Sequence, residues 1–454
     1  MYDLIVIGAG VAGYTAAIRA AKYGLRTAIA ECGSIGGTCL NRGCIPTKFM
    51  ISEMHRYRDI CASVGNGVYS GGITLDYERL INVLSERIGR ITAGVRWLLE
   101  ANGVDILSGS ARFIDGRHIE VNGVSYEADK FIIAAGASPR ELPVERSGDS
   151  RIFTTDDIWS GLHEVPESLA IIGGGAVGLE FAFIYAGLGS DVTVLEQRAS
   201  FFGDIDSDID AEIIKMLNRY GIKYQMECTA GSIFEDDGTV VVADGNGRII
   251  TETSALLMAV GREPRCSGMG LENAGVGYNA HGIITDGAHR TSADNIYAVG
   301  DITGRSMLAY TAAAQAVNAV EDILRKAPAK DETLVPVCIF TDLETAYVGE
   351  MESHARSSGR DVRSVKFLMS ANGRSSVEAS GGFVKLITDA ASGEITGGVC
   401  VCSAASEMIN TVTMAIKQRL TAEQFAHQLF PHPTFSEALS DAAELMNGKC
   451  TYMM

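Results

Sequence analysis

The stretch Leu4-Ile-Val-Ile-Gly-Ala-Gly-Val-Ala-Gly13 opens the chain, and Leu169-Ala-Ile-Ile-Gly-Gly-Gly-Ala-Val-Gly178 repeats its pattern. In both stretches a short apolar run leads into Gly-x-Gly-x-x-Gly, and an alanine-rich segment, a second apolar run and an acidic residue follow at the same spacing. A single glycine pattern is a weak signal, but two complete βαβ patterns with an acid ~20 residues further on are a strong one. The repeat predicts an α/β fold with two Rossmann-like units, each of which binds a dinucleotide.

The residue types in each unit suit a dinucleotide. Glycines let the backbone approach a pyrophosphate, and the start of the helix offers free N–H groups and a positive dipole end. The acid after the second strand, Glu31 or Glu196, accepts hydrogen bonds from ribose hydroxyls. A carboxylate also repels a 2′-phosphate, so Glu196 predicts NAD rather than NADP, although Arg198 is close. The glycines predicted to contact the two nucleotides are Gly8, Gly10, Gly13, Gly173, Gly175 and Gly178.

Composition excludes several classes of protein. The chain has 454 residues, 46% hydrophobic and 21% charged, so it can form large cores. A net charge of −18 argues against a nucleic-acid-binding surface, which needs clustered Lys and Arg. No stretch approaches the ~18–20 apolar residues of a membrane span. Because Met1 leads directly into a predicted strand, without a cleavable leader, we expect a cytoplasmic protein without membrane or nucleic-acid partners.

Further signals suggest about three domains, on a prior of ~150 residues each. Strand-then-glycine segments end at Gly136 and Gly261, and Lys326 to Lys330 resembles a linker. Beyond the linker, predicted strands (383–388) alternate with helices (407–419), and no glycine fingerprint recurs. We expect a first dinucleotide-binding domain of residues 1–145 and 264–332, which ends in a helix over 308–326. Residues 146–263 form the second such domain, and 333–454 form an α+β domain with another role.

Two cysteines, Cys39 and Cys44, lie close together in the segment from Gly36 to Lys48. Ten cysteines in so long a chain do not form a disulfide scaffold, and most are expected to be thiols in a reducing compartment. Zinc sites more often use Cys-x-x-Cys and need four ligands, and no matching pair is near, so no metal is predicted. Cys400 and Cys402 suit one face of a strand, as buried thiols. Spacing alone makes Cys39 and Cys44 candidates for a redox pair.

The order of these motifs along the whole chain resembles the class I pyridine nucleotide–disulfide oxidoreductases, and most of all the dihydrolipoamide dehydrogenase family. The resemblance implies FAD in the first unit, NAD in the second and a dimerisation domain at the C-terminus. NADP-specific relatives, such as glutathione reductases, place arginines where Glu196 stands. In the predicted helix over 308–326, Tyr310 and Gln315 depart from the His and Glu that the family often has at these positions. Further cofactor contacts are predicted at Gly37, Thr38, Lys48, Gly136, Gly261, Asp301 and Ala309.

The resemblance also implies roles for the cysteines. Cys39 exchanges with the substrate, and Cys44 lies against the flavin as a thiolate, the form of cysteine that is a nucleophile. Lys48 pairs with Glu180 beside the reactive nitrogen of the flavin. A cation there favours the reduced, anionic flavin.

The segment Pro431-His-Pro-Thr-Phe-Ser-Glu437 matches the catalytic segment of that family. His432 is the predicted general base, because a histidine of ordinary pKa, ~6.5, accepts and returns a thiol proton at neutral pH. Glu437 orients the ring, as the acid of a catalytic triad does. In the family this pair comes from the other subunit, which implies a homodimer.

The implied reaction oxidises a protein-bound dihydrolipoyl group and reduces NAD⁺ to NADH. The lipoyl group arrives on another protein, of a 2-oxo acid dehydrogenase complex or of the glycine cleavage system. The alternatives are glutathione reductase-like and mercuric reductase-like enzymes, although the latter add a C-terminal cysteine pair and only Cys450 is near this end. A non-catalytic FAD-holding scaffold is disfavoured, because it needs neither the cysteines nor His432.

Overall fold

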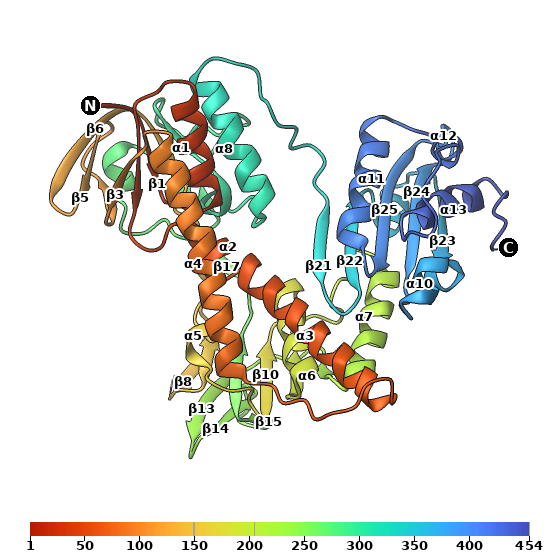
Figure 1. Cartoon of the computed structure of the whole chain (residues 1–454). Coiled ribbons are helices and arrows are strands. Elements are labelled where there is room, and N and C mark those ends of the chain that lie inside the picture. Colours follow the sequence, from red (N-terminus) through yellow and green to blue (C-terminus); the bar gives the residue numbers. More distant parts are fainter. Residues whose placement is uncertain (149, 204, 454) are drawn as a thin grey trace. The chain divides into compact units, whose positions relative to one another are not determined.

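The structure is a computed structural model that describes residues 1–148, 150–203 and 205–453 (Figure 1). Its contacts divide the chain into two units. Unit 1 comprises Met1–Pro143, Phe153–Val165 and Val260–Glu332, and unit 2 comprises Val144–Ile152, Pro166–Ala259 and Thr333–Met454. The predicted α/β class, with two Rossmann-like regions and a C-terminal α+β region, is confirmed. The predicted domain boundaries stay a prediction.

A parallel sheet lies at the centre of unit 1. Strand β1 (Tyr2–Ile7) pairs in parallel with β2 (Thr27–Glu31) and β6 (Val124–Ile133), β2 pairs with β3 (Asp105–Ser108), and β20 (Ile296–Ala298) joins β6. Their short apolar runs suit strands that are covered on both faces. On one face α1 (Val11–Lys22) and α8 (Ala309–Ile323) bury alanines in a common core. The small alanine side chain therefore brings α8, the helix predicted over 308–326, close to the first fingerprint helix.

The remaining elements of unit 1 carry the loops of the candidate site. The antiparallel strands β5 (His118–Val121) and β4 (Ala111–Phe113) extend the sheet from β6. Helices α2 (Gly37–Asn41), α3 (Cys44–Gly65) and α4 (Tyr77–Ala101) follow β2 in the chain, and α5 spans Ile158–Gly161. The smaller elements are β7 (Ala137–Pro139), β17 (Arg262–Pro264), η1 (Leu271–Ala274), β18 (Tyr278–Asn279), β19 (Gly282–Ile283) and η2 (Gly300–Thr303).

The second fingerprint belongs to unit 2. Its parallel strands run in the order β12 (Lys223–Gln225), β11 (Asp191–Leu195), β10 (Ser168–Ile172), β16 (Ala255–Met258). Helix α6 (Ala176–Leu188) follows β10 and is buried along most of its length, whereas the amphipathic α7 (Ser207–Tyr220) buries one stripe. A further sheet contains β15 (Ile249–Thr253), β14 (Thr239–Ala243), β13 (Ser232–Asp236) and β8 (Glu145–Ser147), and β9 spans Ile152–Thr154.

The C-terminal part of unit 2 is an antiparallel sheet in the order β21 (Val337–Phe340), β22 (Glu344–Gly349), β25 (Ile395–Cys402), β24 (Phe383–Asp389), β23 (Val362–Leu368). Helices α11 (Ala405–Lys417), α12 (Ala422–Ala426) and α13 (Glu437–Met446) pack on it through a shared core that contains Cys400 and Cys402. Both thiols are fully buried, as their spacing predicts. The short elements here are α9 (Glu352–Ser357), η3 (Met369–Ala371) and α10 (Gly373–Val377).

One charged cluster joins the two parts of unit 2. The buried ammonium of Lys385 on β24 lies 2.9 Å from Asp206 Oδ2, 2.9 Å from Asp208 Oδ2 and 2.7 Å from Glu352 Oε2. Asp206 caps the start of α7 by accepting a hydrogen bond from the backbone N–H of Asp208. The cluster thus connects the start of α7, in the nucleotide-binding part, to strand β24 of the C-terminal sheet.

Candidate active site

The two glycine fingerprints have the same geometry. Each apolar strand ends at a glycine with positive φ, Gly8 at +99° and Gly173 at +106°, and the helix then begins. A Cβ on Gly13 would lie 1.7 Å from the Gly8 carbonyl oxygen, and one on Gly178 would lie 1.9 Å from that of Gly173. Only glycine permits this contact of strand and helix, which leaves the first N–H groups of each helix open to a phosphate.

The two predicted ribose-binding acids also match in detail. Glu31 accepts hydrogen bonds from the backbone N–H groups of Ala9 (2.6 Å) and Gly33 (2.7 Å). Glu196 accepts them from the corresponding positions, Gly174 (2.7 Å) and Arg198 (2.9 Å). Each carboxylate is therefore held in place at the end of its strand, beside the glycine turn. The second site has one addition, because the Nε atom of Arg198 also lies 3.1 Å from Glu196 Oε1.

The two cysteines come together at the start of a long helix. Cys39 lies in α2, and Cys44 is the first residue of α3, where the helix dipole favours a thiolate. A hydrogen bond to Cys44 raises the pKa of the Cys39 thiol, as do burial and the Cys44 charge, while the Lys48 ammonium acts in the opposite direction. Burial, and then the charges of both cysteines, raises the pKa of Tyr14. The structure thus groups Cys39, Cys44 and Lys48 and adds Tyr14, which the sequence pattern did not indicate.

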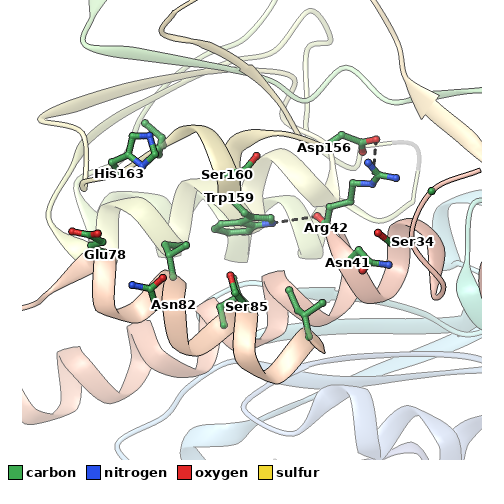
Figure 2. A pocket seen from close by; sticks show the side chains of 15 residues that line it. Ser34, Asn41, Arg42, Glu78, Asn82, Ser85, Asp156, Trp159, Ser160 and His163 are labelled. Atoms are coloured by element: carbon green, nitrogen blue, oxygen red, sulfur yellow. Dashed lines mark hydrogen bonds and ion pairs between the residues drawn. The ribbon is translucent and has the colours of Figure 1, made fainter. Parts of the chain in front are cut away.

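A cavity of about 530 Å³ borders the loop that carries the cysteines (Figure 2). Asn41 and Arg42 contribute from this loop, α4 contributes from a second side, and the segment around α5 from a third. The indole Nε1 of Trp159 donates a hydrogen bond to the Arg42 carbonyl oxygen over 3.2 Å. The cavity wall therefore supports the backbone between Cys39 and Cys44.

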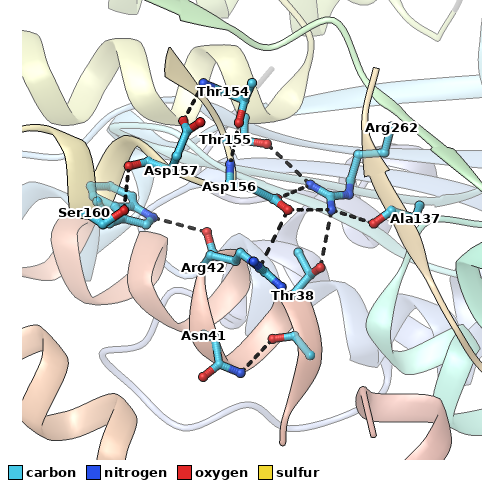
Figure 3. Close-up of polar contacts among 12 residues, drawn as sticks. Thr38, Asn41, Arg42, Ala137, Thr154, Thr155, Asp156, Asp157, Ser160 and Arg262 are labelled. Atoms are coloured by element: carbon cyan, nitrogen blue, oxygen red, sulfur yellow. Dashed lines mark hydrogen bonds and ion pairs between the residues drawn. The ribbon is translucent and has the colours of Figure 1, made fainter. Parts of the chain in front are cut away.

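A polar network holds the same loop through the side chain of Arg42 (Figure 3). Asp156 lies 2.7 Å from Arg262 Nη1 and 3.6 Å from Arg42 Nε. Arg262 also donates to the Ala137 carbonyl (2.7 Å) and to Thr38 Oγ1 (3.3 Å). One carboxylate thus links two arginines and a residue next to Cys39. Sequence reasoning missed this network, because Asp156 is more than 100 residues from both arginines and no shared motif links them.

The remaining predicted FAD contacts of unit 1 lie at turns. Asp301 is in η2, where burial raises the pKa of its carboxyl and Arg262 opposes the shift. Ala309 is the first residue of α8, and Gly136 and Gly261 both have positive φ. Gln315, one of the departures from the family pattern, accepts a hydrogen bond from the Gly300 N–H over 2.8 Å. This residue therefore supports the Gly300–Asp301 turn.

Glu180 is buried in α6, where its Oε1 accepts a hydrogen bond from the backbone N–H of Phe340 (3.1 Å). Sequence reasoning did not find this partner, since a backbone N–H leaves no mark in the residue pattern. Glu180 belongs to unit 2 and Lys48 to unit 1, and their pairing stays a prediction.

The two residues predicted as an acid–base pair lie in contact, and their catalytic role stays a prediction. His432 Nδ1 lies 3.0 Å from Glu437 Oε2, and Glu437 is the first residue of α13. An ionised carboxylate accepts the Nδ1 proton, so the Nε2 lone pair is left available as a base. The His432 side chain is 76% exposed in the single chain, while that of Glu437 is 18% exposed. The ring is thus oriented from its own chain and open on its reactive side.

Comparisons with known proteins agree with this geometry. Residues 2–316 match the family described as pyridine nucleotide-disulphide oxidoreductase, and residues 335–443 match its dimerisation domain. The chain belongs to this family. It is accordingly an FAD-dependent oxidoreductase of the kind that uses a pyridine nucleotide, and its dimerisation domain supports a homodimer. In the part of the chain that the structure describes, every helix is too short or too polar to cross a membrane.

Several relatives in the family align with almost the whole chain. The dihydrolipoyl dehydrogenase of Geobacillus stearothermophilus is 36% identical, over 98% of this chain and 96% of its own. That of Thermus scotoductus is also 36% identical, over 100% and 99%. Among solved structures, the HOCl-induced flavoprotein disulfide reductase RclA from Escherichia coli superposes with a TM-score of 0.90 at 30% identity and covers 98% of this chain and 100% of its own.

Proposed function

We propose that the protein is a dihydrolipoyl dehydrogenase, which oxidises protein-bound dihydrolipoyl groups with NAD⁺ as the acceptor. The observation that carries the proposal is the hydrogen-bonded His432–Glu437 pair in a chain that also places Cys39 and Cys44 together. The near full-length similarity to dihydrolipoyl dehydrogenases supports the substrate. The carrier is a lipoyl-bearing protein of a 2-oxo acid dehydrogenase complex or of the glycine cleavage system, and we place the reaction in the cytoplasm.

The residues of the first unit fit FAD. A Cβ on Gly37 would lie 2.7 Å from the Gly10 Cα, so the backbone around the fingerprint leaves no room for a side chain there. Gly8, Gly10 and Gly13 would face the pyrophosphate and Glu31 the ribose, with Asp301 near the ribityl chain. When bound, FAD supplies the two-electron relay from the cysteine pair to NAD⁺. The corresponding glycines and Glu196 would hold NAD.

The chain's own groups then carry out thiol exchange. One thiolate of the substrate attacks the Cys39 sulfur of the oxidised pair, which breaks the Cys39–Cys44 bond and leaves a Cys44 thiolate. The partner subunit's His432 accepts the proton of the attacking thiol, and Glu437 keeps the ring in the required tautomer. The sulfur of the second substrate thiol then attacks the mixed disulfide, and its proton passes to Cys39, which is released as a thiol. The substrate is thereby oxidised to the cyclic disulfide, and the cysteine pair is reduced by the same two electrons.

Two measurements test this proposal. Purified protein should reduce NAD⁺ when it is supplied with dihydrolipoamide, and the activity should fall by on the order of 10⁴-fold in Cys39→Ser, which removes the sulfur that the substrate attacks. Cys44→Ser should lack the long-wavelength charge-transfer absorbance that the wild type gains on two-electron reduction, whereas Cys39→Ser should show it before any reduction, because its Cys44 has no partner for a disulfide. If the absorbance survives in Cys44→Ser, the roles of the two cysteines are wrong.

A second candidate is a disulfide reductase, which runs toward thiol formation; RclA from Escherichia coli is described as a flavoprotein disulfide reductase. The observation that favours it is the structural similarity to RclA, with a TM-score of 0.90 over 98% of this chain. The two candidates are separated by the dithiol assay, because a reductase would oxidise NADH with a disulfide substrate and would show little dihydrolipoamide-dependent formation of NADH.

A further inference from the structure

Next to the His432–Glu437 pair lies a buried residue for which the reaction has no assigned use. Asn372 is 2% exposed and stands at the end of η3, immediately before α10. Its side-chain Nδ2 donates a hydrogen bond to the Thr434 carbonyl oxygen over 3.0 Å, and lies 3.4 Å from Glu437 Oε1. The two oxygens of Glu437 are therefore divided between two donors, with Asn372 on Oε1 and His432 on Oε2.

The other end of the Asn372 amide is fixed as well. Its Oδ1 accepts a hydrogen bond from the backbone N–H of Ser375 over 3.0 Å, and this bond caps the first turn of α10. The amide cannot rotate without losing both the cap and its donor contacts, so the direction of its N–H groups is set by the turn. Gly373, the next residue, packs beside the imidazole, since a Cβ at that position would lie 3.7 Å from His432 Cε1.

A carboxylate that orients a catalytic histidine works only if its own rotamer is fixed. Glu437 is the first residue of α13, so no earlier turn of this helix packs against its side chain, which is 18% exposed. Asn372, which lies outside α13, supplies a hydrogen-bond donor that fixes this side chain. The bond to Thr434 holds the backbone of the His432 segment at the same time.

We propose that Asn372 is a positioning residue for the His432–Glu437 pair, holding Glu437 in the orientation in which its second oxygen receives the Nδ1 proton of His432. The proposal rests on the proposed function, because it assumes that His432 is the base of that reaction. Asn372 itself contacts neither substrate nor cofactor in this scheme. Its effect on the rate passes through Glu437.

A double-mutant cycle on the holoenzyme tests this dependence. Asn372→Ala should lower kcat/KM for dihydrolipoamide by roughly 10-fold, the equivalent of one hydrogen bond to a charged group. In a Glu437→Gln background the same substitution should cost less than about 2-fold, because the carboxylate it orients is gone. If the effects of the two substitutions multiply, Asn372 acts independently of Glu437 and the proposal is wrong.

The chain offers a matched control for the turn itself. Ser375→Ala removes a buried side-chain hydrogen bond to the Ser380 carbonyl (2.8 Å) in the same turn and leaves Glu437 untouched. This variant should keep kcat/KM within about 2-fold of the wild type. Asn372→Asp keeps an acceptor for the α10 cap but removes the donor to Glu437, so it should be as slow as Asn372→Ala or slower. An active Asn372→Asp enzyme would reduce Asn372 to a helix cap and overturn the proposal.

One readout does not depend on the substrate. The ¹⁵N chemical shifts of a selectively labelled histidine report which ring nitrogen carries the proton, and at pH 9 the wild type should show the Nδ1–H tautomer of His432. The Nε2–H fraction should rise in Asn372→Ala and not in Ser375→Ala. If dihydrolipoamide is not a substrate but the tautomer responds this way, the proposed function fails and the positioning role stands. An unchanged tautomer in Asn372→Ala, with a change in Glu437→Gln, contradicts the role of Asn372.

Discussion

Replacing Lys385 with methionine should destabilise the protein far more than the loss of one surface ion pair. The ammonium is buried and contacts the carboxylates of Asp206, Asp208 and Glu352 at 2.7 to 2.9 Å. In the variant, the carboxylate of Asp206, which is 4% exposed, keeps its charge in a poorly solvated site without the ammonium of Lys385 to compensate it. Removing one partner of a buried pair costs about 3–5 kcal/mol, and we expect a loss in this range for Lys385→Met at pH 7.

The cost should depend on pH in a defined direction. Burial alone would raise the pKa of Glu352, but hydrogen bonds, first of all from Lys385, lower it to about 2. A group whose pKa is lower in the folded state stabilises the fold above its unfolded pKa, ~4.3 for glutamate, and that contribution is lost as the pH falls toward 2. In Lys385→Met this contribution is smaller, because only the hydrogen bonds from Ser364 and Arg356 still lower the pKa of Glu352. The two proteins should therefore differ most near neutral pH and become more alike below about pH 4.

Urea unfolding followed by circular dichroism, at one fixed protein concentration because a dimer is involved, measures the difference. The control is Lys366→Met, on the neighbouring strand β23. Lys366 is 40% exposed and pairs with Asp208 at 2.6 Å, so its loss should cost less than about 1 kcal/mol. If the two variants are equally stable, or if the effect of Lys385→Met does not change between pH 7 and pH 4, the cluster does not stabilise unit 2 as described.

Three further outcomes are expected. Asp156→Asn should raise the two-electron potential of the cysteine–flavin system by on the order of 30 mV in a titration against NADH, because it removes a negative charge beside Arg42 and the redox loop. Glu196→Ser should raise kcat/KM for NADPH relative to NADH roughly 100-fold in steady-state assays, because it removes the repelling carboxylate and releases Arg198. Burial, and then two nearby carboxylates, raises the pKa of Asp441 to about 6, so ionisation of this carboxyl destabilises the fold progressively as the pH rises from about 4, its unfolded pKa, to about 6. The free energy of unfolding of Asp441→Asn, measured in thermal melts, should therefore exceed that of the wild type by about 1 kcal/mol at pH 8, after allowance for solvent screening, and by less at pH 4.5.

Features that depend on local residue order could be predicted from the sequence. The glycine fingerprints, the cysteine loop and the segment from His432 to Glu437 each encode their geometry within a short stretch, because the strand, the turn and the helix start are consecutive. The ion networks could not be predicted in the same way. Asp156 and Arg262, or Lys385 and Asp206, are more than 100 residues apart and meet only once the sheets have formed. In the sequence alone, such a charged residue cannot be distinguished from an ordinary surface residue.

The internal repeat also shows where the two predicted nucleotide sites differ, namely in the residue two positions after each acid. At the first site the position two residues after the acid is Gly33, and only its backbone N–H reaches Glu31. At the second site the corresponding residue is Arg198, whose backbone and guanidinium both contact Glu196. The first site therefore presents a carboxylate with no neighbouring cation in its turn, whereas the second holds an arginine that the carboxylate restrains. Because a 2′-phosphate would have to displace this carboxylate to reach the arginine, we expect the balance between Glu196 and Arg198 to decide which nicotinamide nucleotide is bound.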